Sequence, residues 1–364
     1  MEAVYTEKNM CSGCGACKDI CPFGAIEMEL DKEGFYYPNI NQDKCINCGL
    51  CARSCPFNRK SINRDKEPKR IVGVKVKNLD ERKTSRSGGI FTAMANYCLS
   101  QNGIIYGCVL DKELKVYHTS AESKEEANRF KGSKYVKSDL RDTYNRIKAD
   151  LEAGKKVLFS GTGCEVAGLL ATLKNVDISN LYTCDIICHG VPSPMIYREF
   201  IDFMEKEHNS KITHIDFRDK SYGWSSHLET LTFENKKITT NYYTELFYSH
   251  HILRPSCYNC QFSNMDRIGD ITIADFWGIK EENESFYDEA GVSLALINTE
   301  KGEELFSNII DDIDFIDVNT KSYMQHNLKK PSIKPSNRDE FWKDYEEQEF
   351  EYIMKKYAKY EEGD

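Results

Sequence analysis

The sequence lacks the features that mark membrane, secreted and nucleic-acid-binding proteins. It contains no run of about 18 consecutive apolar residues, so we expect no membrane-spanning helix. Lys and Arg number 49 against 58 Asp and Glu, a net charge of −9. This acidic balance argues against binding to nucleic acid or to an anionic membrane surface. The first residues have neither the basic nor the apolar region of a secretory signal, and we expect a cytoplasmic protein.

Cysteine, in contrast, is abundant. The 364 residues include 15 cysteines, and eight of these fall at repeating intervals within the first 55 residues. Because the cytosol disfavours structural disulfides, such regular spacing in a cytoplasmic protein indicates metal binding. A hydrophobic content of 40% is enough to bury a substantial core.

The eight cysteines form two copies of the pattern C-x2-C-x2-C-x3-C, each followed by proline, within residues 11–26 and 45–60. Three closely spaced thiolates suit three irons of one [4Fe–4S] cluster, and in two-cluster ferredoxins the fourth cysteine of each run binds the other cluster. Structural zinc sites use pairs of cysteines separated by a longer gap, which fits this spacing poorly. The predicted ligands are Cys11, Cys14, Cys17 and Cys55 for one cluster, and Cys45, Cys48, Cys51 and Cys21 for the other. Residues 8–58 thus resemble a bacterial-type 2[4Fe–4S] ferredoxin, an electron carrier.

The rest of the chain indicates a larger domain. After a polar linker at 64–70, strand-like segments (71–76, 104–110, 116–121, 182–190) alternate with helix-like ones (89–100, 195–207). The expected fold class is α/β with α+β elements: a ferredoxin-like iron–sulfur domain at 1–62, then a mixed α/β domain at 71–335. Residues 336–364 are expected to form an acidic C-terminal helix whose aromatic residues dock on the body of the protein.

A second set of cysteines lies in this larger domain. Cys257 and Cys260 form a C-x2-C pair, Cys188 lies at the end of an expected strand, and Cys164 directly follows another. Strand ends of an α/β sheet share one edge, so these four residues are candidates for a third cluster. A zinc site and a redox dithiol are the alternatives at this point. Cys98 and Cys108 are expected to be buried inert thiols, and the position of Cys184 is ambiguous.

Seven motifs strengthen this interpretation. They are, in chain order between residues 85 and 279, SRSGGIFTAM, KGSKYVKS, VLFSGTGCEVAGL, CHGVPSP, IDFRDKSYGW, RPSCYNCQF and DITIADFWGI. Together they resemble the coenzyme F420 hydrogenase/dehydrogenase beta-subunit family. The resemblance implies a flavin-binding α/β domain that holds FAD and a [4Fe–4S] cluster, with Cys164, Cys188, Cys257 and Cys260 as ligands of that cluster.

The sequence departs from the family at one motif. The family usually has G-T-P-C-Q where this chain has Gly161-Thr162-Gly163-Cys164-Glu165. Glycine in place of proline loosens the turn, and glutamate in place of glutamine places a carboxylate near the expected flavin. Because the cysteine is retained, the departure puts the substrate in doubt more than the cluster.

The segment SRSGG precedes an expected helix. Free amides at the N-terminus of a helix, with glycines and an arginine nearby, suit a pyrophosphate, whereas the alternative is an ordinary serine-capped helix. The resemblance favours FAD. A nicotinamide-binding G-x-G-x-x-G motif at 161–166 lacks its third glycine. The expected FAD-binding residues are Ser85, Ser87, Gly88, Gly89, Thr92, Gly132, Ser133, Lys134, Tyr135, Gly161, Thr162 and Gly163.

His189, next to Cys188, is the candidate catalytic residue, as a proton donor or a hydrogen-bond partner of the flavin. The alternative is that it fixes the loop around the cluster. The charged residues at 216–220 are interpreted as a solvated run, and Tyr222, Trp224 and Trp277 as core aromatics.

These features predict an iron–sulfur flavoprotein oxidoreductase that couples two-electron chemistry at FAD to one-electron transfer through [4Fe–4S] clusters. We favour a reductase of a small organic substrate. Its electrons would come from ferredoxin or from a reduced deazaflavin or nicotinamide carrier. The protein is expected to act as a homo-oligomer or as a subunit of a complex. The alternatives are a non-catalytic electron-transfer subunit of a larger redox complex and an iron–sulfur protein without flavin.

Overall fold

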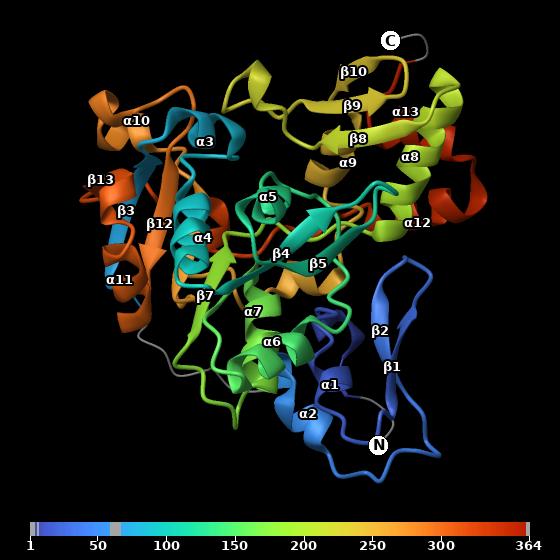
Figure 1. The fold of residues 1–364 in the computed structure, drawn as a ribbon. Helices are drawn as coiled ribbons and strands as arrows, with labels where there is room; N and C mark the ends of the chain where they lie inside the picture. Colours follow the sequence, from blue (N-terminus) through green and yellow to red (C-terminus); the bar gives the residue numbers. More distant parts are fainter. Residues whose placement is uncertain (1–3, 6, 59–66, 362–364) are drawn as a thin grey trace.

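The computed structural model describes residues 4–5, 7–58 and 67–361. A small N-terminal domain lies against a larger domain that is built on an eight-stranded sheet (Figure 1). The expected α/β class, with a small iron–sulfur domain before a larger mixed domain, is confirmed. Residue 62, the expected end of the first domain, and residues 64–66 of the expected linker lie outside the described residues.

In the N-terminal domain, each cysteine repeat forms a short helix that begins after a glycine. Gly15 and Gly49 have φ values of 74° and 70°, a left-handed conformation that glycine adopts at least cost. An antiparallel hairpin lies between the two helices in the chain. The elements are η1 (Lys8–Met10), α1 (Ala16–Asp19), β1 (Ile26–Leu30), β2 (Tyr36–Ile40), α2 (Leu50–Ser54) and η2 (Pro56–Asn58). The described core of the domain is small, and in domains of this size bound metal supplies much of the stability.

The large sheet has the strand order β13-β3-β12-β11-β7-β6-β4-β5. Its four central strands, from β11 to β4, are parallel, and the remaining pairs are antiparallel. The strands are β3 (Arg70–Val76), β4 (Ile104–Leu110), β5 (Val116–Ala121), β6 (Val157–Thr162), β7 (Leu181–Ile186), β11 (Ile271–Asp275), β12 (Ser293–Ile297) and β13 (Ile313–Asp317). The expectation of a strand over 182–190 was wrong at its end, because β7 stops at Ile186 and leaves Cys188 in a loop.

Helices cover both faces of this sheet. In β4, Ile105 packs with α4 and α11 on one face, while Ile104 and Tyr106 pack with α6 and α7 on the other. This alternation follows from the two-residue period of a strand and buries both faces, as parallel strands require. The helices of this layer are α3 (Leu79–Thr84), α4 (Ile90–Ser100), α5 (Lys124–Ala127), α6 (Thr143–Glu152), α7 (Gly163–Thr172), α10 (Ile279–Glu282) and α11 (Glu300–Ser307).

A second sheet of three strands, β10-β9-β8, packs with four further helices. These elements are α8 (Pro194–His208), β8 (Ile212–Asp216), β9 (Glu229–Phe233), β10 (Lys237–Thr240), α9 (Tyr242–Tyr248), α12 (Arg338–Glu347) and α13 (Phe350–Tyr357). The C-terminal segment is two helices rather than the single helix expected. Gln348 and Glu349 are extended, so the chain turns and both Phe341 and Ile353 reach the same core.

The hairpin β1–β2 fastens the two domains together. The hydroxyl of Ser193 donates to the carbonyl oxygen of Glu33, and the Glu33 carboxylate pairs with the buried guanidinium of Arg338. At Gly34 the chain approaches so closely that a Cβ would overlap the side chain of Met195. Within the described ranges, no helix is both long and apolar enough to span a membrane.

Candidate iron–sulfur and cofactor sites

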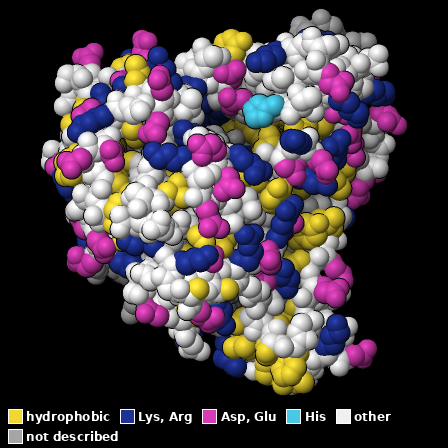
Figure 2. Space-filling model, viewed as in Figure 1, with side chains coloured by type: hydrophobic (Ala, Val, Ile, Leu, Met, Phe, Trp, Pro, Cys, Tyr) yellow, Lys and Arg dark blue, Asp and Glu magenta, His cyan; other side chains and the backbone are white. Residues whose placement is uncertain are grey.

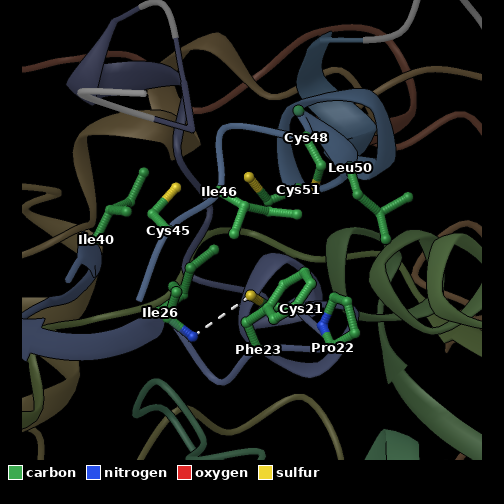
Figure 3. Close-up of a pocket in the computed structure, with 12 residues that line it drawn as sticks. Cys21, Pro22, Phe23, Ile26, Ile40, Cys45, Ile46, Cys48, Leu50 and Cys51 are labelled. Carbon is green, nitrogen blue, oxygen red and sulfur yellow. Dashed lines mark hydrogen bonds between the residues drawn. The ribbon is translucent and has the colours of Figure 1, made fainter. Parts of the chain in front are cut away.

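Cys21, Cys45, Cys48 and Cys51, here called the outer group, line one cavity in the N-terminal domain. Figure 3 shows Cys21 and Cys51 facing each other across it, one from each cysteine repeat. This is the grouping that exchange of the fourth cysteines predicts. Cys48 is exposed. Hydrophobic side chains gather at the lower end of the molecule in Figure 2, over this domain, where Phe23 and Ile46 are among the exposed large apolar residues.

Cys11, Cys14, Cys17 and Cys55, the inner group, lie deeper. Burial raises the pKa of the Cys14 thiol to about 12, and Cys11 and Cys55 raise it further as charged neighbours. Burial likewise raises the pKa of Cys17, and the neighbouring thiols of Cys14, Cys11 and Cys55 raise it further. The thiols of Cys14 and Cys17 are buried and have raised pKa values, so they do not ionise readily without a nearby cation. A cationic iron core supplies the charge that stabilises them as thiolates.

Two further observations test whether an iron–sulfur cluster fits the inner group. The hydroxyl of Ser12 and the Nη1 of Arg254 are buried with no hydrogen-bond partner among the residues that the structure describes, and both residues adjoin Cys11. Donors that point at a cluster sulfur would be satisfied by it. Within the described residues no three Cys, His, Asp or Glu side chains converge on a point that would hold a single metal ion. Cluster ligands differ in this respect, because each binds a different iron.

The parallel pairing of β6 and β7 brings Cys164 and Cys188 to one edge of the sheet. Thr162 of β6 pairs with Ile186 of β7. Cys164 lies two residues after Thr162, and Cys188 lies two residues after Ile186. Each thiol has a pKa raised by burial, to about 11 for Cys164. Cys184, in contrast, lies within β7 and is buried in the core, away from this edge.

Cys257 and Cys260 reach the same edge from the segment η5 (Pro255–Asn259). The backbone amide of Val191 donates to Cys257 Sγ over 3.4 Å, which ties this segment to the loop after Cys188. Cys257 and Cys260 are charged neighbours of Cys188, and Cys164 is a charged neighbour of Cys257. The structure thus assembles the expected set Cys164, Cys188, Cys257 and Cys260, here called the edge group.

The inner group and the edge group are adjacent. Cys14 packs against Gly168 of α7, one turn beyond Cys164, and a Cβ at Gly168 would lie 3.0 Å from Cys14 Cβ. Cys164 is also among the charged neighbours of Cys14. The rings of Phe57 and Phe262 meet edge to face, with centroids 5.7 Å apart, and join the same two regions.

The SRSGG segment lies at the N-terminus of α4, as expected. The Ser85 hydroxyl bonds to Glu81 and Thr92, and the Ser87 hydroxyl donates to the Val292 carbonyl oxygen. A Cβ at Gly88 would overlap the Val74 carbonyl oxygen, so this glycine is required by strand packing rather than by a phosphate. Gly89, with φ 91°, begins the helix. The Thr92 amide already donates to the Gly89 carbonyl oxygen over 2.9 Å, so the amides of Ile90 and Phe91 before it are the first-turn groups available to an anion.

The other predicted FAD-binding segments lie nearby or contact the edge group. In the segment Gly132, Ser133, Lys134 and Tyr135, the ammonium of Lys134 donates to carbonyl oxygens of residues 129–132, and burial lowers its pKa to about 8. Arg218 and Arg86 are charged neighbours of Tyr135. The junction between β6 and α7 is formed by Gly161, Thr162 and Gly163. Gly163 lies against Phe262, which is two residues after Cys260 of the edge group.

The interpretation of residues 216–220 as a solvated run was wrong for Arg218 and Lys220. Arg218 is buried and pairs with Asp275 over 2.7 Å. The ammonium of Lys220 donates to the carbonyl oxygens of Arg82, Ser85 and Ser87, and burial together with Arg86 lowers its pKa to about 8. The pattern of charges along β8 and the following loop does not predict these partners, because they lie far away in the sequence.

Arg86, the arginine of the SRSGG segment, lies beside Arg218. Arg86 donates to the Arg218 and Trp224 carbonyl oxygens, and its Nε is buried with no partner among the described residues. Burial and the neighbouring Arg218 lower the pKa of Arg86. Two buried guanidiniums that face one carboxylate favour an added anion, so the residues fit the phosphates of FAD.

The candidate catalytic residue His189 lies in the loop after Cys188. Its Nε2 lies 2.6 Å from His250 Nε2, and its ring packs against Phe247 and Tyr248. Burial and His250 lower the pKa of His189 to about 4, so it is neutral at pH 7. These contacts suit a residue that fixes the loop, and the catalytic role stays a prediction. Trp224 is a core aromatic as expected, but Trp277, stacked on it, is 42% exposed.

Family models match both parts of the chain. Residues 10–59 match the 4Fe-4S dicluster domain, and residues 154–321 match the C terminus of the coenzyme F420 hydrogenase/dehydrogenase beta subunit. The expected resemblance is confirmed, and the dicluster domain indicates an iron–sulfur electron-transfer protein.

The beta-subunit domain also has a structural relative. A chain in a xenon-derivatised structure of the F420-reducing [NiFe] hydrogenase complex from Methanosarcina barkeri is 18% identical, with a TM-score of 0.48. The match covers 70% of this chain and 85% of that one. No curated protein matches the chain.

Proposed function

We propose that the chain is an iron–sulfur flavoprotein oxidoreductase with three [4Fe–4S] clusters and one FAD. The observation that carries the proposal is the adjacency of the inner and edge groups: Cys14 packs against Gly168, one turn along α7 from Cys164, and Cys164 is a charged neighbour of Cys14. An electron carrier that only serves an external enzyme has no need for a third set of thiols against its inner cluster.

FAD would be held by the first turn of α4, the segment 132–135 and the guanidiniums of Arg86 and Arg218. The buried Arg86 Nε, which has no partner, supports an anion at this position. When bound, FAD exchanges two electrons with an organic compound and single electrons with iron–sulfur clusters. The residues of this chain position the anionic part of the cofactor and keep its surroundings positively charged.

We propose the reductase direction, with a small organic substrate and with ferredoxin or a reduced deazaflavin or nicotinamide carrier as the source of electrons. A protein partner would meet the outer group, where Cys48 is exposed beside Phe23 and Ile46. The cytoplasm, which keeps thiols reduced, is the proposed compartment.

The first experiment is to measure iron and flavin in anaerobically purified protein and to identify the released flavin. Three clusters predict about 12 irons, with one FAD per chain. About eight irons without flavin would contradict both the third cluster and the flavin, and would leave an electron carrier. About 12 irons without flavin would contradict only the flavoprotein assignment.

A further inference from the structure

Arg254 lies buried between the inner group and the edge group. Its side chain is 1% exposed, and it is the residue that precedes η5, three positions before Cys257. Its backbone amide donates over 3.0 Å to the Val191 carbonyl oxygen, in the loop after Cys188. The backbone of Arg254 is thus part of the edge group's support, while its side chain extends into the N-terminal domain.

The guanidinium of Arg254 wraps around Cys11. Its Nε donates to the Cys11 carbonyl oxygen over 2.7 Å, and its Nη2 lies 3.7 Å from Cys11 Sγ and 2.9 Å from the Tyr36 carbonyl oxygen. Its Cζ lies 4.2 Å from the ring centroid of Tyr37. The Nη1 has no hydrogen-bond partner within the described part of the chain, and it lies against Gly13, where a Cβ would be 2.9 Å away.

The positive charge of Arg254 has no carboxylate partner among the described residues. Its contacts are two carbonyl oxygens, aromatic faces and a cysteine sulfur. An isolated buried charge is strongly unfavourable, and a nearby negative charge removes that cost. A [4Fe–4S] cluster with four thiolates is negative, and it gains one more negative charge when it is reduced.

The outer group has a different environment. Arg53, in the same cysteine repeat, donates to the Cys48 carbonyl oxygen in an exposed position. Solvent and salt screen a charge in such a position, whereas a charge buried among aromatic rings acts at nearly full strength. The two clusters of the dicluster domain therefore differ in the field they experience.

We propose that Arg254 raises the reduction potential of the inner cluster above that of the outer cluster. A buried cation at hydrogen-bond distance from a ligand sulfur stabilises the reduced, more negative cluster. Electrons that enter at the exposed outer cluster then collect at the inner cluster, beside the edge group. The proposal rests on the iron–sulfur clusters of the dicluster domain and requires neither FAD nor a substrate.

The test is an EPR-monitored redox titration of the purified holoprotein and three variants. Arg254→Gln removes the charge, Arg254→Lys keeps it without the planar donors, and Arg198→Gln removes an exposed arginine of α8 that pairs with Asp202. We expect Arg254→Gln to shift one cluster's midpoint to a more negative potential, Arg254→Lys to shift it less, and Arg198→Gln to shift none. Iron and flavin contents, measured on the same samples, separate this result from the proposed function. Unchanged midpoints in Arg254→Gln with full iron content would overturn the proposal.

If both Arg254 variants lose iron, a second measurement decides. The protein carries Arg53→Gln, so that no arginine side chain remains at that position next to the outer group. It is labelled with 15N-arginine, and its reduced clusters are studied by pulsed EPR. We expect a weak 15N coupling to one reduced cluster, which Arg254 supplies. Absence of that coupling would overturn the proposal, because the proposal places the guanidinium at hydrogen-bond distance from a sulfur ligand of the cluster.

Discussion

Lys137 and Glu165 form an ion pair that is buried beside Cys164. The carboxylate also accepts the amide of Thr162 over 2.9 Å, which caps the start of α7. Burial alone would raise the pKa of Glu165, but the Lys137 ammonium, together with His118 and the Thr162 amide, lowers the pKa to about 2. The glutamate in the GTGCE motif is therefore held by a lysine, which explains how a carboxylate is tolerated where the family has an amide.

The first prediction concerns this ion pair. Glu165→Gln leaves the Lys137 ammonium buried without a partner, which costs about 3–5 kcal/mol, on the order of 5–10 °C in apparent Tm. The double variant Lys137→Met with Glu165→Gln removes both charges, and we expect it to recover most of the loss. Anaerobic thermal denaturation of the three proteins checks this. A single variant as stable as the wild type would contradict the structural role of the pair.

The second prediction separates the edge group from the other cysteines of the large domain. Cys188→Ala should remove one cluster, so that iron falls from about 12 to about 8 per chain. Cys184→Ala is the matched control, because Cys184 lies four residues earlier, inside β7, and belongs to the core. Iron analysis and EPR of both variants test the assignment. Equal iron contents in the two variants would show that Cys188 is not a ligand.

The two cysteine runs of the N-terminal domain and most strands of the large sheet were predictable because their signals are local. A ligand run is complete within 11 residues, and a strand reveals itself by its own alternation or apolar run. Arg254 was not predictable, since its contact with Cys11 spans 243 positions. Lys220 looked solvated for the same reason: its three acceptors lie more than 130 residues away. Gly88 was predicted as an FAD-binding residue, but the close neighbour that requires a glycine there is the Val74 carbonyl oxygen of β3.

The third prediction concerns the contact between the two domains. Gly168→Ala places a methyl group 3.0 Å from Cys14 Cβ and 2.7 Å from the Tyr144 hydroxyl, so α7 and the inner group must move apart. We expect a loss of about 1–3 kcal/mol and easier loss of the inner cluster's iron on exposure to air. Thr172→Ala, one turn further along α7 and only partly buried, is the control. Apparent Tm and the rate of iron release are the measurements. Identical behaviour of the two variants would contradict the close contact.

The fourth prediction tests the cofactor loop. Lys220→Met removes a donor shared by the carbonyl oxygens of Arg82, Ser85 and Ser87, so the SRSGG segment loses its fixed shape. We expect FAD affinity to fall about tenfold or more, the effect of losing one or two charge-assisted hydrogen bonds, with iron content unchanged. Lys236→Met, at the exposed turn between β9 and β10, is the matched control. Full flavin content in Lys220→Met would show that this segment does not hold the cofactor.

The fifth prediction follows from the charge on Lys220. Burial, and then the neighbouring Arg86, lower its pKa to about 8 from 10.5, so the folded protein binds this proton more weakly than the unfolded chain does. Stability must therefore rise with pH between about 8 and 10.5 through this group, because the unfolded chain binds more protons there. We expect the apparent Tm of the wild type to gain on that of Lys220→Met as the pH rises from 8 to 10, whereas Lys236→Met should follow the wild type. A difference between wild type and Lys220→Met that is constant over this range would mean that Lys220 keeps its proton, and that the carbonyl oxygens around it stabilise the ammonium more than burial destabilises it.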